Sequence, residues 1–268
     1  MFTYARILSL LLLWSLTAGA ASFAPRFLAF QNGLGLGSPE KDARLLKEIG
    51  YDGVCQVFDR GEKLAERVAA YDRVGLPVLS VYLNVDDQPI PASDVQPLAN
   101  RGAMIELTIR KMTPQTVAAV RQTAEMAEGL NIKVALYPHF GFAVAAMPQA
   151  MELMEKVNHP NLGVMFNLCH FLKSEKAEDM EKILKAAGDR LFAVSTSGAD
   201  LNGKSWATLI QPLDQGDFPQ ERLFRHLKKL NFEGPVGLQC YGIKGDKPEL
   251  LKRSFTAWSK ILQNMVRR

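Results

Sequence analysis

Eight short apolar runs, each followed by a longer segment of helical periodicity, constrain the fold of this chain more than any other feature. The runs are rich in Val, Ile, Leu and Phe, and they cover residues 27–31, 53–57, 77–83, 103–109, 132–137, 162–167, 191–195 and 235–240. Strands that are apolar throughout are typical of parallel sheets covered on both faces. Because eight such units close most simply into a barrel, we predict an α/β protein with a single (β/α)8 barrel.

The segments between these runs carry helix-start signals. Ser38 precedes Pro39, and Thr113 precedes Pro114, so a capping side chain stands before a proline of the first turn. Helices are expected to begin near Pro39, Gly61, Pro114, Met147, Ala177, Phe218 and Glu249, with a short helix at 93–99 and a long loop at 198–217. The alternative is an open doubly wound sheet with a dinucleotide loop at 33–37, but the spacing there is G-x-G-x-G and the fingerprint requires G-x-G-x-x-G.

The first twenty residues differ from the rest of the chain. Arg6 is followed by an apolar run of about ten residues and then by small residues ending at Ala20, which is typical of a secretory signal and too short for a membrane span. We therefore expect a signal peptide at 1–20 and the barrel domain at 21–268, with the mature protein exported to the periplasm or secreted and without a membrane span. An uncleaved anchor is the alternative.

Charge and cysteine content narrow the classes of partner and site. Lys and Arg number 32 against 28 Asp and Glu, and no stretch concentrates positive charge, so nucleic acid is not an expected partner. The three cysteines, Cys55, Cys169 and Cys240, lie in apolar segments, and we expect buried free thiols.

Polar side chains follow the predicted strands at the end where a (β/α)8 barrel carries its chemistry. Amides and hydroxyls dominate them, and such groups both donate and accept hydrogen bonds, as the hydroxyls of a small carbohydrate do. The predicted substrate-binding residues are Gln31, Gln56, Asn84, Arg110, Tyr137, Asn167, Ser197 and Gln239.

The histidines divide into two pairs. His139 and His170 follow the fifth and sixth strands, where an imidazole with a pKa near 6.5 can exchange protons at neutral pH. They are the predicted catalytic residues, with Asp200 after the seventh strand as a partner acid; structural hydrogen bonding is the alternative role. His159 and His226 lie in a turn and on a charged helix, and we expect both to be solvated.

Three segments, GYDGV at 50–54, NLGVMFNLCH at 161–170 and GPVGL at 234–238, resemble the xylose isomerase-like TIM barrels, the sugar phosphate isomerase/epimerase and endonuclease IV-like superfamily. The resemblance implies a barrel that acts on sugars with a divalent metal such as Mn, Mg, Zn or Co. In the active sugar epimerases of that group the metal is held by Glu, Asp, His and Glu on strands five to eight. The matching positions here are Tyr137, Asn167, Ser197 and Gln239, and the His of the Asp-x-x-His motif is kept as His170.

These replacements remove about three negative charges from the site. Hard cations such as Mg²⁺ and Mn²⁺ prefer anionic oxygen ligands. The sequence therefore predicts no cofactor firmly. The remaining candidates for a weak metal site are His139, Asn167, His170 and Gln239. The two-glutamate proton shuttle of the relatives is also lost, because Gln239 cannot take a proton and Tyr137, with an ordinary pKa near 10, is a poor base.

The leading hypothesis is an exported sugar or sugar-phosphate isomerase/epimerase-like protein. His139 or His170 would act as general base, and Arg110 with Asn167 would hold the enediol oxygen. The alternatives are a catalytically inactive carbohydrate-binding barrel, and a lyase or hydrolase acting on oxidised sugars. The sequence predicts neither the sugar, nor its phosphorylation, nor the oligomeric state.

Overall fold

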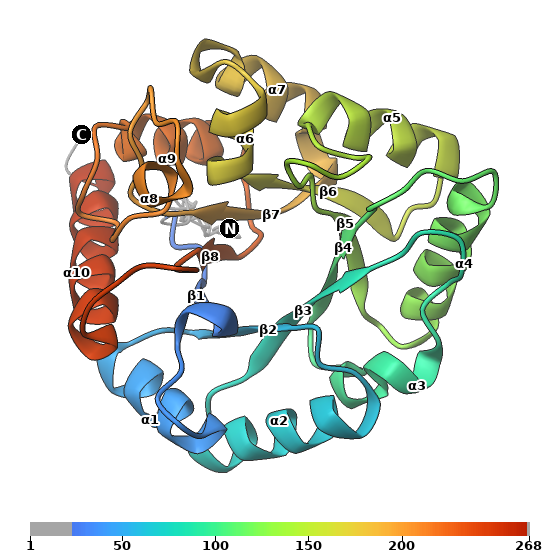
Figure 1. Cartoon of the computed structure of the whole chain (residues 1–268), viewed down its shortest axis with the longest axis horizontal. Helices are drawn as coiled ribbons and strands as arrows, with labels where there is room; N and C mark the ends of the chain where they lie inside the picture. Colours follow the sequence, from blue (N-terminus) through green and yellow to red (C-terminus); the bar gives the residue numbers. More distant parts are fainter. Residues whose placement is uncertain (1–22, 267–268) are drawn as a thin grey trace, which may run out of the picture.

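The computed structural model describes residues 23–266, and its eight parallel strands form one closed barrel in chain order, surrounded by helices (Figure 1). The predicted single (β/α)8 barrel is confirmed. The predicted signal peptide lies outside the described residues. The strands are β1 (Phe27–Phe30), β2 (Gly53–Val57), β3 (Val78–Asn84), β4 (Met104–Thr108), β5 (Lys133–Leu136), β6 (Leu162–Asn167), β7 (Leu191–Thr196) and β8 (Val236–Leu238).

The main helices are α1 (Pro39–Ile49), α2 (Gly61–Val74), α3 (Ala92–Val95), α4 (Thr116–Gly129), α5 (Met147–Val157), α6 (Leu168–Ser174), α7 (Met180–Ala187), α8 (Trp206–Leu209), α9 (Gln220–Lys229) and α10 (Lys247–Val266), and the short 3-10 turns are η1 (Gln31–Gly33), η2 (Gln96–Leu98), η3 (Ala177–Asp179) and η4 (Gly188–Arg190). Two of these helices were not predicted. α6 starts directly after β6 with no side-chain cap, and α8 lies within the predicted long loop. None of the helices in residues 23–266 is long and apolar enough to cross a membrane.

Side chains from alternate strand positions separate the core into two parts. Those pointing into the barrel form a small cluster that includes Phe30, Cys55 and Tyr137, and those pointing outward pack under the helices. On the outer side Phe27 stacks on Trp258 of α10 with ring centroids 4.4 Å apart, which ties the last helix to the first strand. The three cysteines are free and buried, as predicted.

The long segment after β7 is fixed to the barrel. Gly198 and Gln211 form an antiparallel bridge, and the Ser197 hydroxyl donates to the Leu209 carbonyl at 3.0 Å. The segment thereby carries α8, with Trp206 as its first residue, over the carboxyl ends of the strands. A side chain at position 198 would collide with the carbonyl oxygens of Pro212 and Gln215, so this close approach requires glycine.

Gly198→Ala is expected to destabilise the protein by about 2 kcal/mol, because the added methyl group must push the segment away from β7. Gly129→Ala at the end of α4 is the matched control: a methyl group there meets no atom within 4 Å, and it should be neutral or stabilising by roughly 0.5 kcal/mol. Urea unfolding of both variants measures the difference. Equal stabilities would show that the segment is not packed as described.

Candidate functional site

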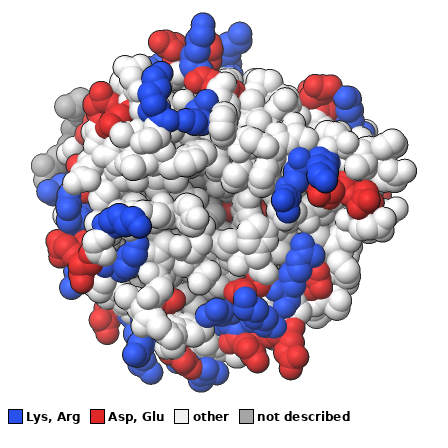
Figure 2. All heavy atoms as spheres, in the orientation of Figure 1, with Lys and Arg blue, Asp and Glu red and all other residues white. Residues whose placement is uncertain are grey.

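A pocket of about 500 Å³ opens at the carboxyl ends of the strands. Its lining is mostly aromatic and contains no Lys, Arg, Asp or Glu. Figure 2 shows the face that carries α8 in Figure 1: uncharged residues form most of its hollowed centre, a little acidic surface is visible inside the hollow, and most charged side chains lie toward the edge. The lining residues are Phe30, Asn32, Val57, Phe58, Tyr82, Tyr137, His139, His170, Trp206, Ile210, Gln239 and Tyr241.

The backbone N–H and C=O of Phe140 hold the two imidazoles of this pocket. His139 Nδ1 lies 3.0 Å from the Phe140 carbonyl oxygen, and the Phe140 N–H donates to His170 Nδ1 at 3.1 Å. A carbonyl can only accept and an N–H can only donate, so Nδ1 carries the proton in His139 and lacks it in His170. When both rings are neutral, Nε2 of His139 is an acceptor and Nε2 of His170 is a donor.

The surroundings keep both rings neutral. Burial and, to a smaller extent, the neighbouring His139 together lower the pKa of His170 to about 2. Burial also lowers the pKa of His139, against the raising effect of its hydrogen bond to Phe140. The two ring centroids are 4.0 Å apart, and among the described residues neither Nε2 has a hydrogen-bond partner. A ligand in the pocket therefore meets one nitrogen acceptor beside one N–H donor.

Aromatic rings form the walls around the imidazoles. Tyr82 and Tyr137 meet edge to face at 5.0 Å, and Trp206 meets His170 edge to face at 5.1 Å. Burial raises the pKa of Tyr82 to about 12 and that of Tyr137 well above its usual value, so both hydroxyls remain protonated at neutral pH.

Phe58 completes the wall in a strained conformation. Its φ of 59° lies in the left-handed region, which costs a bulky residue about 1–2 kcal/mol, and its ring is 51% exposed against the edge of Tyr82. Phe58 therefore presents an exposed aromatic ring in the lining of the pocket.

The family model described as Xylose isomerase-like TIM barrel matches residues 99–261, more than half of the chain. The chain belongs to the xylose isomerase-like TIM barrel family. No curated protein matches the sequence.

Solved structures of this architecture resemble the chain at low sequence identity. D-allulose 3-epimerase from Methylomonas sp., in complex with D-allulose, has a TM-score of 0.71 and 17% identity, over 89% of this chain and 98% of that one. The IOLI protein with a binding zinc atom has a TM-score of 0.69 and 15% identity, over 89% and 98%. A xylose isomerase-like TIM barrel/4-hydroxyphenylpyruvate dioxygenase fusion protein has a TM-score of 0.68 and 15% identity, and this chain covers 42% of it, with 87% of this chain matched.

The residues at the metal positions implied by the resemblance do not fit a divalent cation in this family member. The Asn167 amide oxygen accepts from the Cys169 thiol at 3.2 Å, and the Gln239 amide oxygen accepts from the Tyr241 N–H at 3.1 Å. Both neutral oxygens are thus already engaged, and no carboxylate lines the pocket. Within residues 23–266 no group of three or more His, Cys, Asp or Glu side chains is placed to hold a metal ion.

The structure brings four of the predicted site residues into the pocket, namely Tyr137, His139, His170 and Gln239. Gln31, Asn84, Arg110 and Asn167 do not line it, and Asn32 lines it in place of Gln31. The Asn84 amide oxygen accepts from the Thr108 hydroxyl at 2.7 Å, and the exposed Arg110 guanidinium lies 5.8 Å from the centroid of the Phe142 ring.

Gln56 points away from the site. Cys55 and Val57 on either side of it belong to the barrel interior, so the alternation of the strand turns Gln56 outward toward the helices. There its side chain is fully buried, and its amide nitrogen and oxygen have no hydrogen-bond partner among the described residues. In a strand that is apolar on both faces, the sequence alone does not tell which set of side chains faces inward.

Ser197 and Asp200 serve the segment after β7. Ser197 is fully buried and holds Leu209, as described above. The Asp200 carboxylate accepts from the Gln211 amide at 3.0 Å and lines a separate, shallow hollow formed by the segment itself. Asp200 therefore does not reach the imidazoles, and the role of partner acid predicted for it is not supported by its position.

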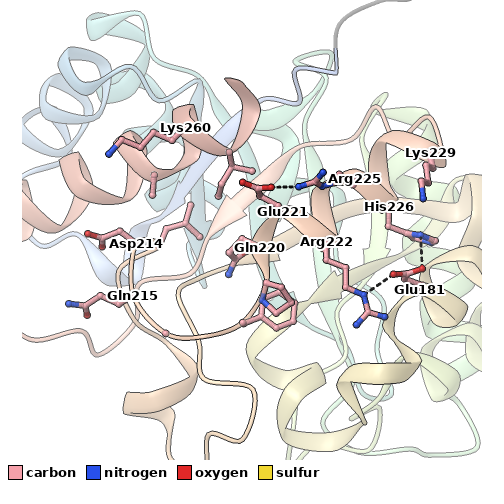
Figure 3. Close-up of a pocket in the computed structure, with 16 residues that line it drawn as sticks. Glu181, Asp214, Gln215, Gln220, Glu221, Arg222, Arg225, His226, Lys229 and Lys260 are labelled. Carbon is pink, nitrogen blue, oxygen red and sulfur yellow. Dashed lines mark hydrogen bonds and ion pairs between the residues drawn. The ribbon is translucent and has the colours of Figure 1, made fainter. Parts of the chain in front are cut away.

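Another shallow hollow, of about 690 Å³ and distinct from the one at Asp200, lies on the outside of the barrel between α7, α9 and α10 (Figure 3). Two ion pairs lie along it, Arg222 with Glu181 and Arg225 with Glu221. His226 lies 3.6 Å from Glu181 with its Nε2 buried, and His159 is only 8% exposed, so the expectation that both are solvated is wrong. No predicted site residue reaches this hollow.

Sequence reasoning missed Glu106, the one acidic residue of β4. The register pairs it with Tyr82 and Ala135, which places it in the barrel interior close to the floor of the pocket. Its Oε1 accepts from the Ser80 hydroxyl at 2.7 Å, and its Oε2 is buried with no hydrogen-bond partner among the described residues. Burial raises the pKa of Glu106 to about 7. A lone Glu within an otherwise apolar strand was the available signal.

Glu106→Gln is expected to stabilise the protein more as the pH rises. The folded state holds the Glu106 proton up to a pKa of about 7, and the unfolded chain releases it near 4.5, so the wild type loses stability across that interval, by at most about 3 kcal/mol. Unfolding at several pH values measures the gap between variant and wild type. It should widen from pH 5 to pH 8, about twofold or more. The exposed Glu152→Gln is the control, and a constant gap for Glu106→Gln would contradict a buried, protonated carboxyl group.

Proposed function

We propose that this protein is an exported sugar isomerase that moves a carbon-bound proton without a metal, at the carboxyl-end face of its barrel. The observation that carries the proposal is the pair of imidazoles held in opposite tautomers by the backbone C=O and N–H of Phe140. Support for a sugar comes from the relative of known structure that binds D-allulose, and from a pocket of about 500 Å³. Export rests on the apolar run that follows Arg6.

The two rings have different tasks in this mechanism. His139 Nε2, an unprotonated acceptor, removes the proton from the carbon next to the substrate carbonyl. His170 Nε2–H donates a hydrogen bond to the carbonyl oxygen, where negative charge develops as the enediolate forms. Within the enediolate, the proton of the adjacent hydroxyl group passes to the former carbonyl oxygen, so that the negative charge moves to the other oxygen. His139, now protonated, returns its proton to the former carbonyl carbon, and the carbonyl group has moved by one position.

The presence of one base favours isomerisation over epimerisation. Inverting a carbon requires a group on the face opposite to the base that gives a proton. The groups at the other positions are Gln239, which neither gives nor takes a proton, and Tyr137, whose pKa burial raises well above its usual value and which is therefore a weak acid. Transfer between adjacent carbons on one face needs only His139.

Solvent exchange tests this proposal. Purified protein, with chelator present, is incubated in D₂O with D-allulose, D-fructose, D-xylose and D-ribose, and deuterium at carbon is followed by NMR. His139→Gln is expected to lower exchange by at least about 100-fold, because it removes the base, and His170→Gln by about tenfold to 100-fold, because it removes one donor to the oxyanion. His159→Gln, remote from the pocket, is the control.

The pH dependence of exchange should be flat through the neutral range. Burial lowers the pKa of His139 below its usual 6.5, so the base stays unprotonated at pH 6.5 and the rate falls only at lower pH. A rate that halves at pH 6.5 or above would contradict the proposed base.

A sugar-binding protein without activity is the second candidate. Asn167 and Gln239 preserve the shape of the carboxylates expected from the resemblance while removing their reactivity. Saturable binding of a sugar with no deuterium exchange in the wild type would favour this function.

A further inference from the structure

We propose that the pocket is selective for charge: it accepts uncharged sugars, through a carbonyl or hydroxyl oxygen next to a hydroxyl group, and it excludes phosphate esters and sugar acids. This inference rests on the proposed function and defines its substrate class. The observations that carry it are the composition of the twelve lining residues, the position of the nearest cations and the pattern of donors and acceptors at the imidazoles.

No lining residue offers a counter-charge to an anion. The groups in the pocket that can change charge are two histidines and three tyrosines, and the pKa values of His139, His170, Tyr82 and Tyr137 are shifted so that these side chains are neutral near pH 7. An anion that enters loses its hydration, and without an ionic partner this loss is not recovered. The interior Glu106, when ionised, adds further repulsion from below.

The nearest cations are engaged outside the pocket. The Lys173 ammonium donates to the Lys204 carbonyl, and it lies 5.8 Å from the centroid of the Trp206 ring and 5.6 Å from that of Phe140. Arg110 lies over Phe142, which in turn stacks on His139 at 4.1 Å. Neither Lys173 nor Arg110 lines the pocket, so each contacts an aromatic ring where a phosphate site would need a direct hydrogen bond.

The free nitrogens match a neutral pair of adjacent oxygens. His139 Nε2 faces a carbon that bears a hydrogen and a hydroxyl group, the carbon from which it removes a proton in the proposed reaction, and His170 Nε2–H donates to the oxygen on the next carbon. A carboxylate or a phosphate dianion offers acceptors only and leaves His139 Nε2 facing a lone pair. The aromatic walls, including Trp206 and Tyr82, suit the apolar C–H face of a sugar ring.

Matched ligand pairs test the proposal. Binding of D-fructose and D-fructose 6-phosphate, and of D-glucose and D-glucuronate, is measured by calorimetry near pH 7. The neutral member of each pair should bind at least about tenfold more tightly, a difference of about 1.4 kcal/mol. Phe58→Lys places an ammonium group in the wall of the pocket, and Phe58→Gln removes the same ring without adding charge.

The comparison of these variants isolates charge from shape. The measured quantity is the ratio of the affinity for the phosphate ester to the affinity for the neutral sugar. This ratio should be about tenfold higher in Phe58→Lys than in Phe58→Gln. Equal or tighter binding of the charged members by the wild type overturns the charge selectivity and leaves the proposed function standing. Failure of every sugar, neutral or charged, to bind the wild type overturns the proposed function and this inference together.

Discussion

The backbone of one residue, Phe140, sets the chemistry of the pocket. Its carbonyl accepts from one imidazole and its N–H donates to the other, so two identical side chains become an acceptor and a donor. The backbone around it is itself held: the His139 N–H donates to Val144, and the Phe142 N–H donates to His139. A tight turn after β5 therefore fixes the tautomers that any ligand meets.

The second constraint is the absence of fixed charge from the pocket lining. The resemblance implies carboxylates where Tyr137, Asn167 and Gln239 stand, and the structure has only Tyr137 and Gln239 in the lining and no acidic residue there. The carboxylic acid that β4 supplies is instead Glu106, which is closed off beside Ser80 with a pKa raised to about 7. Burial of the imidazoles and loss of the acids act in the same direction, because both favour neutral side chains.

The barrel itself could be predicted from the sequence, because long apolar strands and proline-marked helix starts are local signals. The predicted strand at 77–83 and the observed β3 at Val78–Asn84 differ by one residue at each end. α6 was missed because it begins at Leu168 without a capping side chain. For the site, proximity to strand ends correctly located the pocket residues His139 and His170. It failed for Gln56, because a strand that is apolar on both faces gives no sign of which side chains point into the barrel. It also failed for Asp200, because the sequence of a twenty-residue loop does not predict where the loop folds back onto the barrel.

The most direct test of this account is the protonation state of the two imidazoles, measured by long-range ¹H–¹⁵N correlation NMR on protein labelled with ¹⁵N-histidine. There are four histidines in the chain, and the loss of a signal in His139→Gln or His170→Gln assigns each ring. The account predicts two neutral rings near pH 7, with the proton on Nδ1 in His139 and on Nε2 in His170. The same tautomer in both rings, or a charged imidazole at either position, would contradict it.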